Sequence, residues 1–474
     1  MRGTGGAGAV GTAGVGAAGG GAGIGAGGGG VNLLALRSHN AALVLDLLRT
    51  AGDEGISRLE LAERTGLTPQ AVSKITARLR EDGLVAEAGR RASTGGKPRT
   101  VLRLVPEAGH AVGVHLDRDE VRVVLVDLRG TVVGEHRAAL DLGAGAEAVL
   151  GAVGETVAGV LPGGFGGGAE VGLDGEVRPG PAGFDRGSGP GAGSGGFDRG
   201  SGPGAGSGGF DRGSRPGSAG SDEDLRPGSA GLDDGSRPGG AGRAGGSLPG
   251  LAGLDPALLG VGVALPGPLD HVRGVLHRVT GFPGWDGFPL REALAGRLGV
   301  PVVVDKDTNA AALGLAAGGE GGSFAYLHLG TGLGAGLVIG GSVHRGARTG
   351  AGEFGHQVIQ LDGAPCTCGN RGCVEALCLA AVARGDLDEA ARVLGAGAAN
   401  LVGLLDIDVV LLGGRTVAAA PDAFTSGVGA VLEARSRRTG QDAVPVRVAP
   451  GGDGAVAVGA AQLVLGPVFG RGGG

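Results

Sequence analysis

The most specific chemistry in this sequence lies between residues 353 and 373. A Glu-Phe-Gly-His string at Glu353–His356 is followed by a cysteine-rich string that reads Cys-Thr-Cys-Gly-Asn-Arg-Gly-Cys. Three thiolates and one imidazole form a tetrahedral zinc set with no vacant position, so the metal would be structural. Gly369 and Gly372 let the chain turn tightly enough for one ion to reach all three sulfurs. The predicted zinc ligands are His356, Cys366, Cys368 and Cys373.

The placement of the cysteines also bears on the compartment of the protein. All four lie between Cys366 and Cys378, whereas a secreted disulfide scaffold would scatter them across the fold. We therefore expect a cytoplasmic protein with one local metal site. The competing interpretation is a redox centre, but a disulfide within a Cys-x-Cys string would be strained. Cys378 lies outside the zinc set and is expected to be a buried, small hydrophobic residue.

A second group of residues has the chemistry needed to contact nucleic acid. Thr68 and Pro69 mark the start of a predicted helix in which Val72, Ile75 and Leu79 face inward. Its opposite face carries small or hydrogen-bonding side chains that suit base edges: Gln70, Ser73, Lys74, Ala77 and Arg78. Two predicted strands follow, and the turn between them is basic, as in a winged helix-turn-helix: it carries Arg90, Arg91, Lys97 and Arg99.

The distribution of charge supports this assignment. Residues 31–104 contain twelve Lys and Arg against eight Asp and Glu, a net charge of +4. The rest of the chain carries −10, which gives the total of −6. A small basic module attached to an acidic body fits a protein that reads DNA with one part only. The alternative is a generic three-helix domain whose charged face lies in solvent.

Together, the zinc string and the preceding winged helix resemble those of the ROK family, whose members are repressors, sugar kinases and unassigned reading frames. The winged helix is similar to that of the family's repressor branch, which includes the xylose and N-acetylglucosamine repressors. The likeness covers residues 31–161 and 254–466. It implies an α/β fold in which an actin-like (ribonuclease H-like) pair of lobes closes over a sugar and, in the kinases, over ATP.

The resemblance also implies roles for single residues. Glu353 and His356 take the places of the Glu and His that hold sugar hydroxyls, and Glu375 takes the place of a further sugar contact. Asp307, in the string Lys306-Asp307-Thr308-Asn309, takes the place of the catalytic base. Simpler interpretations exist, since Asp307 could end a strand and Glu375 could cap a helix.

The sequence departs from the kinase pattern where the phosphates of ATP would bind. The family's Asp-x-Gly-Gly-Thr loop is replaced by His115–Asp119, so Asp117 and Asp119 place carboxylates where phosphates need to lie. A second Gly-rich turn is intact, but a hairpin alone would explain it; it comprises Gly330, Thr331 and Gly332. We therefore expect a vestigial phosphate loop, no bound ATP and no catalytic residue, with Asp307 as a vestigial base.

The predicted sugar pocket departs from the family as well. The Asn that precedes a Pro-Gly-Trp turn is Gly281, and the Asn beside the base position is Lys306. Lys306, which we include among the candidate sugar-binding residues, either contacts an anionic ligand or pairs with Asp305 or Asp307. We favour the pairing.

Apolar periodicity predicts the elements that position these residues. In the basic module we expect three helices. The first spans 39–50, the second starts with a capping box of Ser57 and Glu60, and the third is capped by Thr68. Alternating strands and helices follow, which predicts an α/β body. The expected elements are 84–88, 100–104, 121–127, 131–135, 145–160, 259–265, 302–305, 324–329, 333–339, 387–404 and 409–412.

Two Gly-rich stretches lack the apolar residues needed for a core, and the second repeats GFDRGSGPGAGSG at Gly183–Gly195 and Gly196–Gly208. We therefore predict a disordered tail over 1–30 and a disordered insertion over 162–253. Between them lie a winged helix-turn-helix over 31–104 and a sensor domain over 105–161 and 254–470. The sequence has no strongly apolar run of about 18 residues free of Gly, so we expect no membrane span.

These features predict a cytoplasmic, nucleoid-associated transcriptional repressor of carbohydrate genes. It would bind double-stranded operator DNA as a homodimer or homotetramer, and sense a small sugar or sugar derivative without kinase activity. One alternative is an active, ATP-dependent, glucokinase-like enzyme with a DNA-binding arm. Another is a repressor that binds no ligand. The sequence names neither the operator nor the effector, nor whether the effector releases or strengthens DNA binding.

Overall fold

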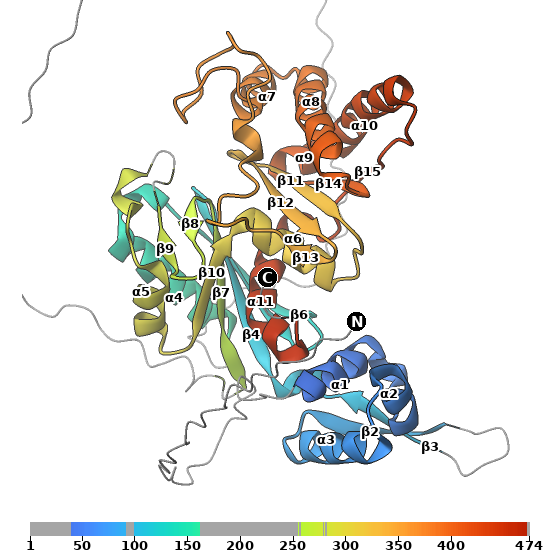
Figure 1. Cartoon of the computed structure of the whole chain (residues 1–474). Coiled ribbons are helices and arrows are strands. Elements are labelled where there is room, and N and C mark those ends of the chain that lie inside the picture. The colour runs from blue at the N-terminus through green and yellow to red at the C-terminus, as the bar shows by residue number, and fades with distance from the viewer. Residues whose placement is uncertain are drawn as a thin grey trace, which may run out of the picture. The chain divides into compact units, whose positions relative to one another are not determined.

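The computed structural model describes residues 39–91, 99–161, 255, 257–277, 279 and 282–471, which belong to one compact unit. Lys97, Gly281, the predicted tail and the predicted insertion lie outside the described residues. The described part contains three larger sheets, one in an N-terminal module and one in each of two α/β lobes (Figure 1). The predicted α/β architecture behind a winged helix-turn-helix is therefore confirmed.

The N-terminal module has the helices and strands expected from its caps and apolar faces. The backbone N–H of Glu60 donates to Ser57 Oγ at 3.3 Å, and the N–H of Ser57 donates to Glu60 Oε2 at 2.8 Å, which completes the predicted capping box. Its sheet has the order β1-β3-β2 and is antiparallel. The elements are α1 (His39–Thr50), β1 (Ile56–Ser57), α2 (Arg58–Thr65), α3 (Pro69–Glu81), β2 (Val85–Arg91) and β3 (Arg99–Leu104).

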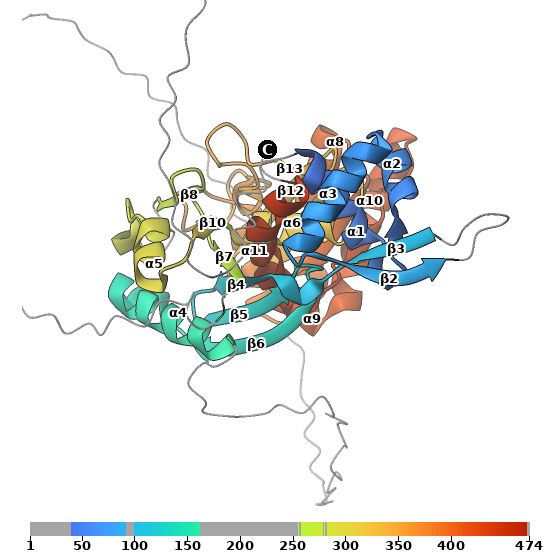
Figure 2. The ribbon, with the colours of Figure 1, turned by 90° about the horizontal axis from the view of Figure 1, so that it is seen from below.

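The first lobe is a five-stranded sheet with the order β10-β7-β4-β5-β6. Apolar side chains of α4 and α5 pack on one face of this sheet, and α11 covers the other (Figure 2). The elements are β4 (His110–Leu116), β5 (Glu120–Asp127), β6 (Val132–Ala139), α4 (Ala146–Val160), β7 (Leu258–Leu265), α5 (Leu290–Leu298), β10 (Val302–Lys306) and α11 (Ala455–Leu465). A short pair of strands, β8 (Leu269–Asp270) and β9 (Val275–Leu276), extends from β7.

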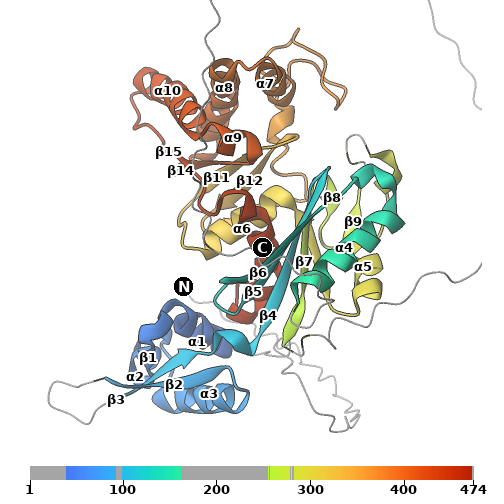
Figure 3. The same cartoon turned by 180° about the vertical axis from the view of Figure 1, so that it is seen from behind.

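The second lobe is a five-stranded sheet with the order β13-β12-β11-β14-β15. Apolar residues of α7, α8 and α10 pack on one face, whereas α6 and α11 lie between the two large sheets (Figure 3). The elements are α6 (Asp307–Ala317), β11 (Phe324–Leu329), β12 (Leu333–Ile339), β13 (Ser342–Val343), η7 (Phe354–His356), α7 (Val374–Ala383), α8 (Leu387–Leu405), β14 (Val409–Gly413), α9 (Arg415–Ala419), α10 (Pro421–Thr439) and β15 (Val446–Val448).

Helix α11 packs against the first sheet through backbone. A Cβ atom on Gly113 of β4 or Gly262 of β7 would lie 1.9 or 1.8 Å from a carbonyl oxygen of α11, so only glycine fits at either position. The segment Gly452–Phe469 is long and apolar enough to cross a membrane, with a mean hydropathy of 1.3 over 18 residues. However, 72% of it is buried inside the molecule, as in a core helix.

Candidate functional site

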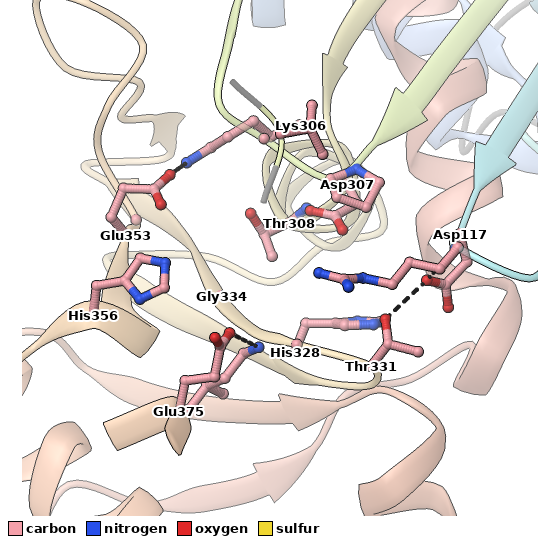
Figure 4. A pocket seen from close by; sticks show the side chains of 17 residues that line it. Asp117, Lys306, Asp307, Thr308, His328, Thr331, Gly334, Glu353, His356 and Glu375 are labelled. Atoms are coloured by element: carbon pink, nitrogen blue, oxygen red, sulfur yellow. Dashed lines mark hydrogen bonds and ion pairs between the residues drawn. The ribbon is translucent and has the colours of Figure 1, made fainter. Parts of the chain in front are cut away.

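A cleft gathers the predicted sugar-binding residues from several elements (Figure 4). Lys306 and Asp307 lie where β10 passes into α6. Glu353 precedes η7, His356 ends it, and Glu375 lies in the first turn of α7. All five line the cleft, although they span 70 positions of the sequence between 306 and 375. We call this group of five residues the sugar end of the cleft.

The carboxylates at the sugar end are held in place by nearby donors. Glu375 Oε2 accepts a hydrogen bond from the backbone N–H of Leu333 at 2.8 Å, which ties α7 to the Gly-rich turn (Figure 4). The backbone N–H of Thr308 donates to Asp307 Oδ1 at 2.6 Å. Desolvation by the pocket walls raises the pKa of Asp307, and the neighbouring His328 opposes that rise. Carboxylates fixed in this way can accept hydrogen bonds from the hydroxyls of a ligand.

Lys306 forms a pair, as favoured from the sequence, but its partner is neither of the two flanking aspartates. Its Nζ lies 3.0 Å from Glu353 Oε1 and also donates to the carbonyl of Ala351 at 2.5 Å. Asp305 instead pairs with Arg345, at 2.8 Å. Lys306 is 3% exposed, so its charge needs a partner, and Glu353 provides it from inside the cleft.

At the other end of the cleft, side chains of one lobe contact those of the other. We call Asp117, Asp119, Thr331 and Arg415 the phosphate end, because it adjoins the Gly-rich turn. Thr331 Oγ1 donates to Asp117 Oδ1 at 3.1 Å. Arg415, the first residue of α9, donates to both oxygens of Asp119 at 2.9 and 3.1 Å, and to Asp117 Oδ2 at 2.9 Å. The carboxylates therefore lie where the sequence placed them, and internal donors hold them.

Two histidines, His115 and His328, lie next to the phosphate end. His328 lines the cleft, and its Nδ1 lies 3.0 Å from the Tyr326 hydroxyl. The ring of His115 lies edge-on to that of His328, with their centroids 6.4 Å apart. Burial and the nearby His328 lower the pKa of His115 to about 3, so its imidazole is neutral at physiological pH.

The four predicted zinc ligands come together. Their ligand atoms all lie within 4.8 Å of one another. Sγ of Cys368 lies 3.7 Å from Sγ of Cys373, and Sγ of Cys366 lies 3.7 Å from Nδ1 of His356. Tetrahedral zinc with bonds of about 2.3 Å to sulfur separates two ligand atoms by about 3.8 Å, whereas a disulfide needs about 2.05 Å. The residues present therefore fit zinc, and the cysteines are free thiols.

His356 was assigned both to the zinc set and to the sugar site, and its position is compatible with both. The residue lines the cleft, while its Nδ1 faces the cysteine string. Zinc bound there would fix the orientation of a ring that also borders the ligand. Cys378 is fully buried, its Sγ contacts the carbonyl of Ala390 at 3.5 Å, and burial raises its pKa to about 12, as expected of an inert core residue.

The predicted DNA-contacting face of α3 is open to solvent. Val72 and Leu79 are buried and Ile75 is partly buried, which leaves the opposite face exposed. The exposed residues are Gln70, Ser73, Lys74, Ala77 and Arg78. Arg99 is also exposed, at the start of β3. These residues remain predictions, since exposure permits a contact with DNA but does not demonstrate one.

Several residues of the cleft were not found from the sequence. Arg118, Thr308 and His328 line it, and Arg415 closes its phosphate end. Arg118 lies within the altered loop His115–Asp119, and its guanidinium lies 5.4 Å from the ring centroid of Phe282. Arg415 follows a Gly-Gly pair after a buried strand, a common signal for a turn that gives no indication of a partner far back in the chain.

Two family models match the chain. They are described as winged helix-turn-helix DNA-binding, over residues 44–86, and ROK family, over residues 253–384. Among curated proteins, a putative xylose repressor of Caldicellulosiruptor sp. (strain Rt8B.4) is 29% identical over 252 residues, or 44% of this chain and 63% of that protein. A glucokinase of Thermotoga maritima is 40% identical over 133 residues, or 27% and 42% of the two chains.

The solved structures include a similar fold of nearly the same extent. A ROK family transcriptional regulator, a homolog of the E. coli MLC protein, aligns with a TM-score of 0.61 at 18% identity. The alignment covers 92% of this chain and 98% of that chain. The curated matches cover less than two thirds of their own proteins, whereas the structural match supports the complete fold.

Proposed function

We propose that this chain, which carries a ROK family domain behind a winged helix-turn-helix, is a transcriptional repressor whose DNA binding responds to a small sugar or sugar derivative. One observation carries the proposal: the cleft keeps its sugar end, while the carboxylates at its phosphate end are paired with the protein's own Arg415. A winged helix in the same chain supplies the output that a ligand-binding cleft without a reaction would need.

The exposed face of α3 supports binding to double-stranded DNA. A helix of 13 residues, capped by Thr68 and opened by Pro69, presents hydrogen-bonding side chains on the side opposite its core contacts. A recognition helix of this kind enters the major groove, while the hairpin of β2 and β3 contacts the phosphates. Relatives described as xylose repressors support the same use for the module.

The polar arc at the sugar end supports a carbohydrate effector. Asp307, Glu353 and Glu375 offer acceptors around the cleft, and Lys306 and His356 offer donors. A few convergent polar groups of both kinds suit a polyhydroxylated ligand. The pair of Lys306 and Glu353 would be divided between the ligand's hydroxyls when a sugar binds, which does not require a charged effector.

The phosphate end argues against phosphoryl transfer. Catalysis of that reaction needs backbone donors and cations around the phosphates. Here Asp117 and Asp119 occupy the loop, and Arg415 is already engaged by both of them. A bound polyphosphate would have to displace these pairs and would then face two unpaired carboxylates. We infer that ATP does not bind productively and that Asp307 does not act as a base.

We also assign the His356 and cysteine set to a structural zinc ion, which would brace the wall of the cleft from behind. Zinc supplies rigid cross-linking of its four ligands and leaves no open coordination position for chemistry. We place the protein in the cytoplasm at the nucleoid, as a homodimer or homotetramer, because repressors that read two half-sites with paired recognition helices are symmetric.

Three measurements on the purified chain test the proposal. The first selects operator DNA from a random-sequence pool and measures its binding by fluorescence anisotropy. The second titrates that complex with D-xylose, D-glucose, N-acetylglucosamine and glucose 6-phosphate. The third follows ADP release from ATP with the same sugars. We expect sequence-specific binding, a shift in operator affinity with one sugar, and no ADP release above background.

The alternatives give different results in the same measurements. ADP release that depends on a sugar would identify an active sugar kinase with a DNA-binding arm, an outcome that the glucokinase relatives make worth testing. Sequence-specific DNA binding without any sugar bound by calorimetry would instead identify a repressor without a ligand. For the DNA contact itself, Lys74→Ala or Arg78→Ala should weaken binding by about 1–3 kcal/mol if the side chain reads a base.

A further inference from the structure

Helix α6 begins at the sugar end of the cleft, and its last residue contacts Arg471, which also contacts the DNA-reading module. Its first residue is Asp307, which lines the cleft. Its last residue is Ala317, whose carbonyl accepts a hydrogen bond from Arg471 Nη1 at 3.4 Å. Eleven residues of α-helix span about 16 Å. A rigid element therefore joins the ligand site to a contact far from it.

Arg471 also holds the first helix of the module. Its Nη2 lies 3.0 Å from Asp46 Oδ1 and donates to Asp46 Oδ2 at 3.2 Å. The same carboxylate pairs with Arg49 at 3.2 Å, and Arg49 lies over the ring of Phe469, 5.2 Å from its centroid. One guanidinium thus contacts the end of α6 and, through Asp46, helix α1.

Apolar packing connects the same two elements by a second route. A Cβ on Gly459 of α11 would lie 1.9 Å from the carbonyl oxygen of Ala310, so α11 and α6 meet backbone to backbone. The chain then leaves α11 through η9 (Gly466–Phe469). Residues of α11 and η9 share one hydrophobic core with α1; the core includes Val44, Leu45, Leu48, Ala461, Val464, Leu465, Val468 and Phe469.

We propose that Arg471 couples the ligand site to DNA binding, by fastening the far end of α6 to helix α1 through Asp46. This rests on the proposed function and assigns a route to its regulation. A ligand that contacts Asp307 biases the position of α6 between the lobes. Because α6 and α11 meet backbone to backbone at Ala310 and Gly459 and share a core around that contact, a displacement at Asp307 shifts both helices together, and the Arg471 contacts transmit it to α1.

The experiment measures the coupling itself in the full chain. Operator affinity is determined without and with a saturating sugar, the probe being whichever of D-xylose, D-glucose, N-acetylglucosamine and glucose 6-phosphate shifts the wild type. The ratio of the two dissociation constants is the coupling. We expect Arg471→Gln to lower this ratio by about 2–30-fold. Its sugar affinity without DNA, and its operator affinity without sugar, should stay near those of the wild type.

A matched control is available in Arg129, which forms another ion pair between the body and the module. Arg129 pairs with Asp53 of the module from the turn between β5 and β6, and no hydrogen bond or ion pair among the described residues joins it to α6. Arg129→Gln should therefore keep the wild-type ratio. The reciprocal measurement, sugar affinity with and without operator, must give the same ratio for every variant.

The possible outcomes separate this inference from the proposed function. An unchanged ratio in Arg471→Gln, beside a clear response in the wild type, overturns the role of Arg471 and leaves the repressor assignment intact. Equal losses in Arg471→Gln and Arg129→Gln also overturn it, because any loosening of the module would then suffice. If Arg471→Gln does not fold, Asp46→Asn removes the same pair from the other side. No response in the wild type refutes the proposed function, and the coupling with it.

Discussion

The sugar end and the phosphate end of the cleft are built from the same two lobes, but their polar side chains are used differently. At the sugar end, three carboxylates point into the cleft with part of their accepting capacity unused. At the phosphate end, Asp117 and Asp119 point at Arg415 and Thr331, which already occupy their oxygens. The carboxylates at the sugar end can still accept hydrogen bonds from a ligand, whereas those at the phosphate end are paired within the protein.

Under the proposed function, this difference indicates which half of a kinase-like cleft a sensor needs. Binding a sugar requires fixed acceptors and donors, which the zinc string and the Leu333 amide can stabilise at small cost. Binding polyphosphate requires a close approach of backbone to oxygen, which Asp117 and Arg118 deny where glycines would permit it. Ion pairs between the lobes then replace contacts that a nucleotide would have made.

The largest effect on the difference between the two ends is expected from removing the zinc site next to the sugar end. Cys368→Ser should lose zinc, measured as metal per chain, and lower the melting temperature by on the order of 10 °C. Sugar binding should be lost with it, because His356 would no longer be fixed. The control is Cys378→Ala, a cysteine in the next helix that lies outside the set. Wild-type protein with far less than one zinc per chain would contradict the site.

The next largest effect is expected at a sugar-end carboxylate. Glu353→Gln should weaken sugar binding by about 10–150-fold, since hydrogen bonds to charged groups contribute about 1.5–3 kcal/mol. Glu389→Gln, in an exposed pair with Arg392, is the control for removing a carboxylate elsewhere. The measurement is the sugar affinity of each variant by calorimetry, with the sugar that shifts the operator affinity of the wild type. Equal affinities for Glu353→Gln and the wild type would remove Glu353 from the site.

A smaller effect, of opposite sign for stability and binding, is expected at Asp307. Desolvation raises the pKa of this carboxyl, so its ionised form costs stability near pH 7 and that cost vanishes once the group is protonated. Asp307→Asn should therefore melt higher than the wild type at pH 7, by up to about 3 °C, while it binds sugar less well. The difference in melting temperature should disappear below about pH 4. A variant that melts lower at pH 7 would refute this account.

The smallest effect is expected at the phosphate end. Arg415→Ala should cost about 1 kcal/mol or less in urea unfolding at pH 7, because its pairs are partly exposed. Arg415 lowers the pKa of Asp119, so this contribution is present at neutral pH and lost as the pH falls through the lowered value, below about 4. Arg437→Ala, on an exposed face of α10, is the control. Sugar-dependent ADP release that appears in Arg415→Ala would show that the ion pairs alone prevent catalysis.

The features that could be predicted from the sequence depend on neighbours in the chain. The capping box of Ser57 and Glu60, the Pro69 start of α3 and the spacing of Cys366, Cys368 and Cys373 each involve residues within one or two turns. Strands such as 324–329 and 333–339 were predicted with the bounds that the structure gives, because both are mainly apolar runs. Local chemistry determined these features, so a local pattern was sufficient.

The features that were not predicted depend on residues brought together from distant parts of the chain. Arg415 pairs with Asp117 across 298 positions, and Lys306 pairs with Glu353 across 47. Helix α11 gave no usable signal, because apolar residues occur all round it and no amphipathic face marks its neighbours. Strand β1 is two residues long, too short for any periodicity.

The close packing of α11 on Gly113 and Gly262 also has a consequence for how the protein folds during synthesis. The groove that α11 fills runs across β4 and β7, but α11 begins about 190 residues after β7 ends, which takes roughly 10–40 s of synthesis. Until α11 has been translated, the first sheet presents an uncovered apolar face. Exposed apolar surface of this kind promotes aggregation, so we expect the nascent lobe to need protection until this late helix completes it.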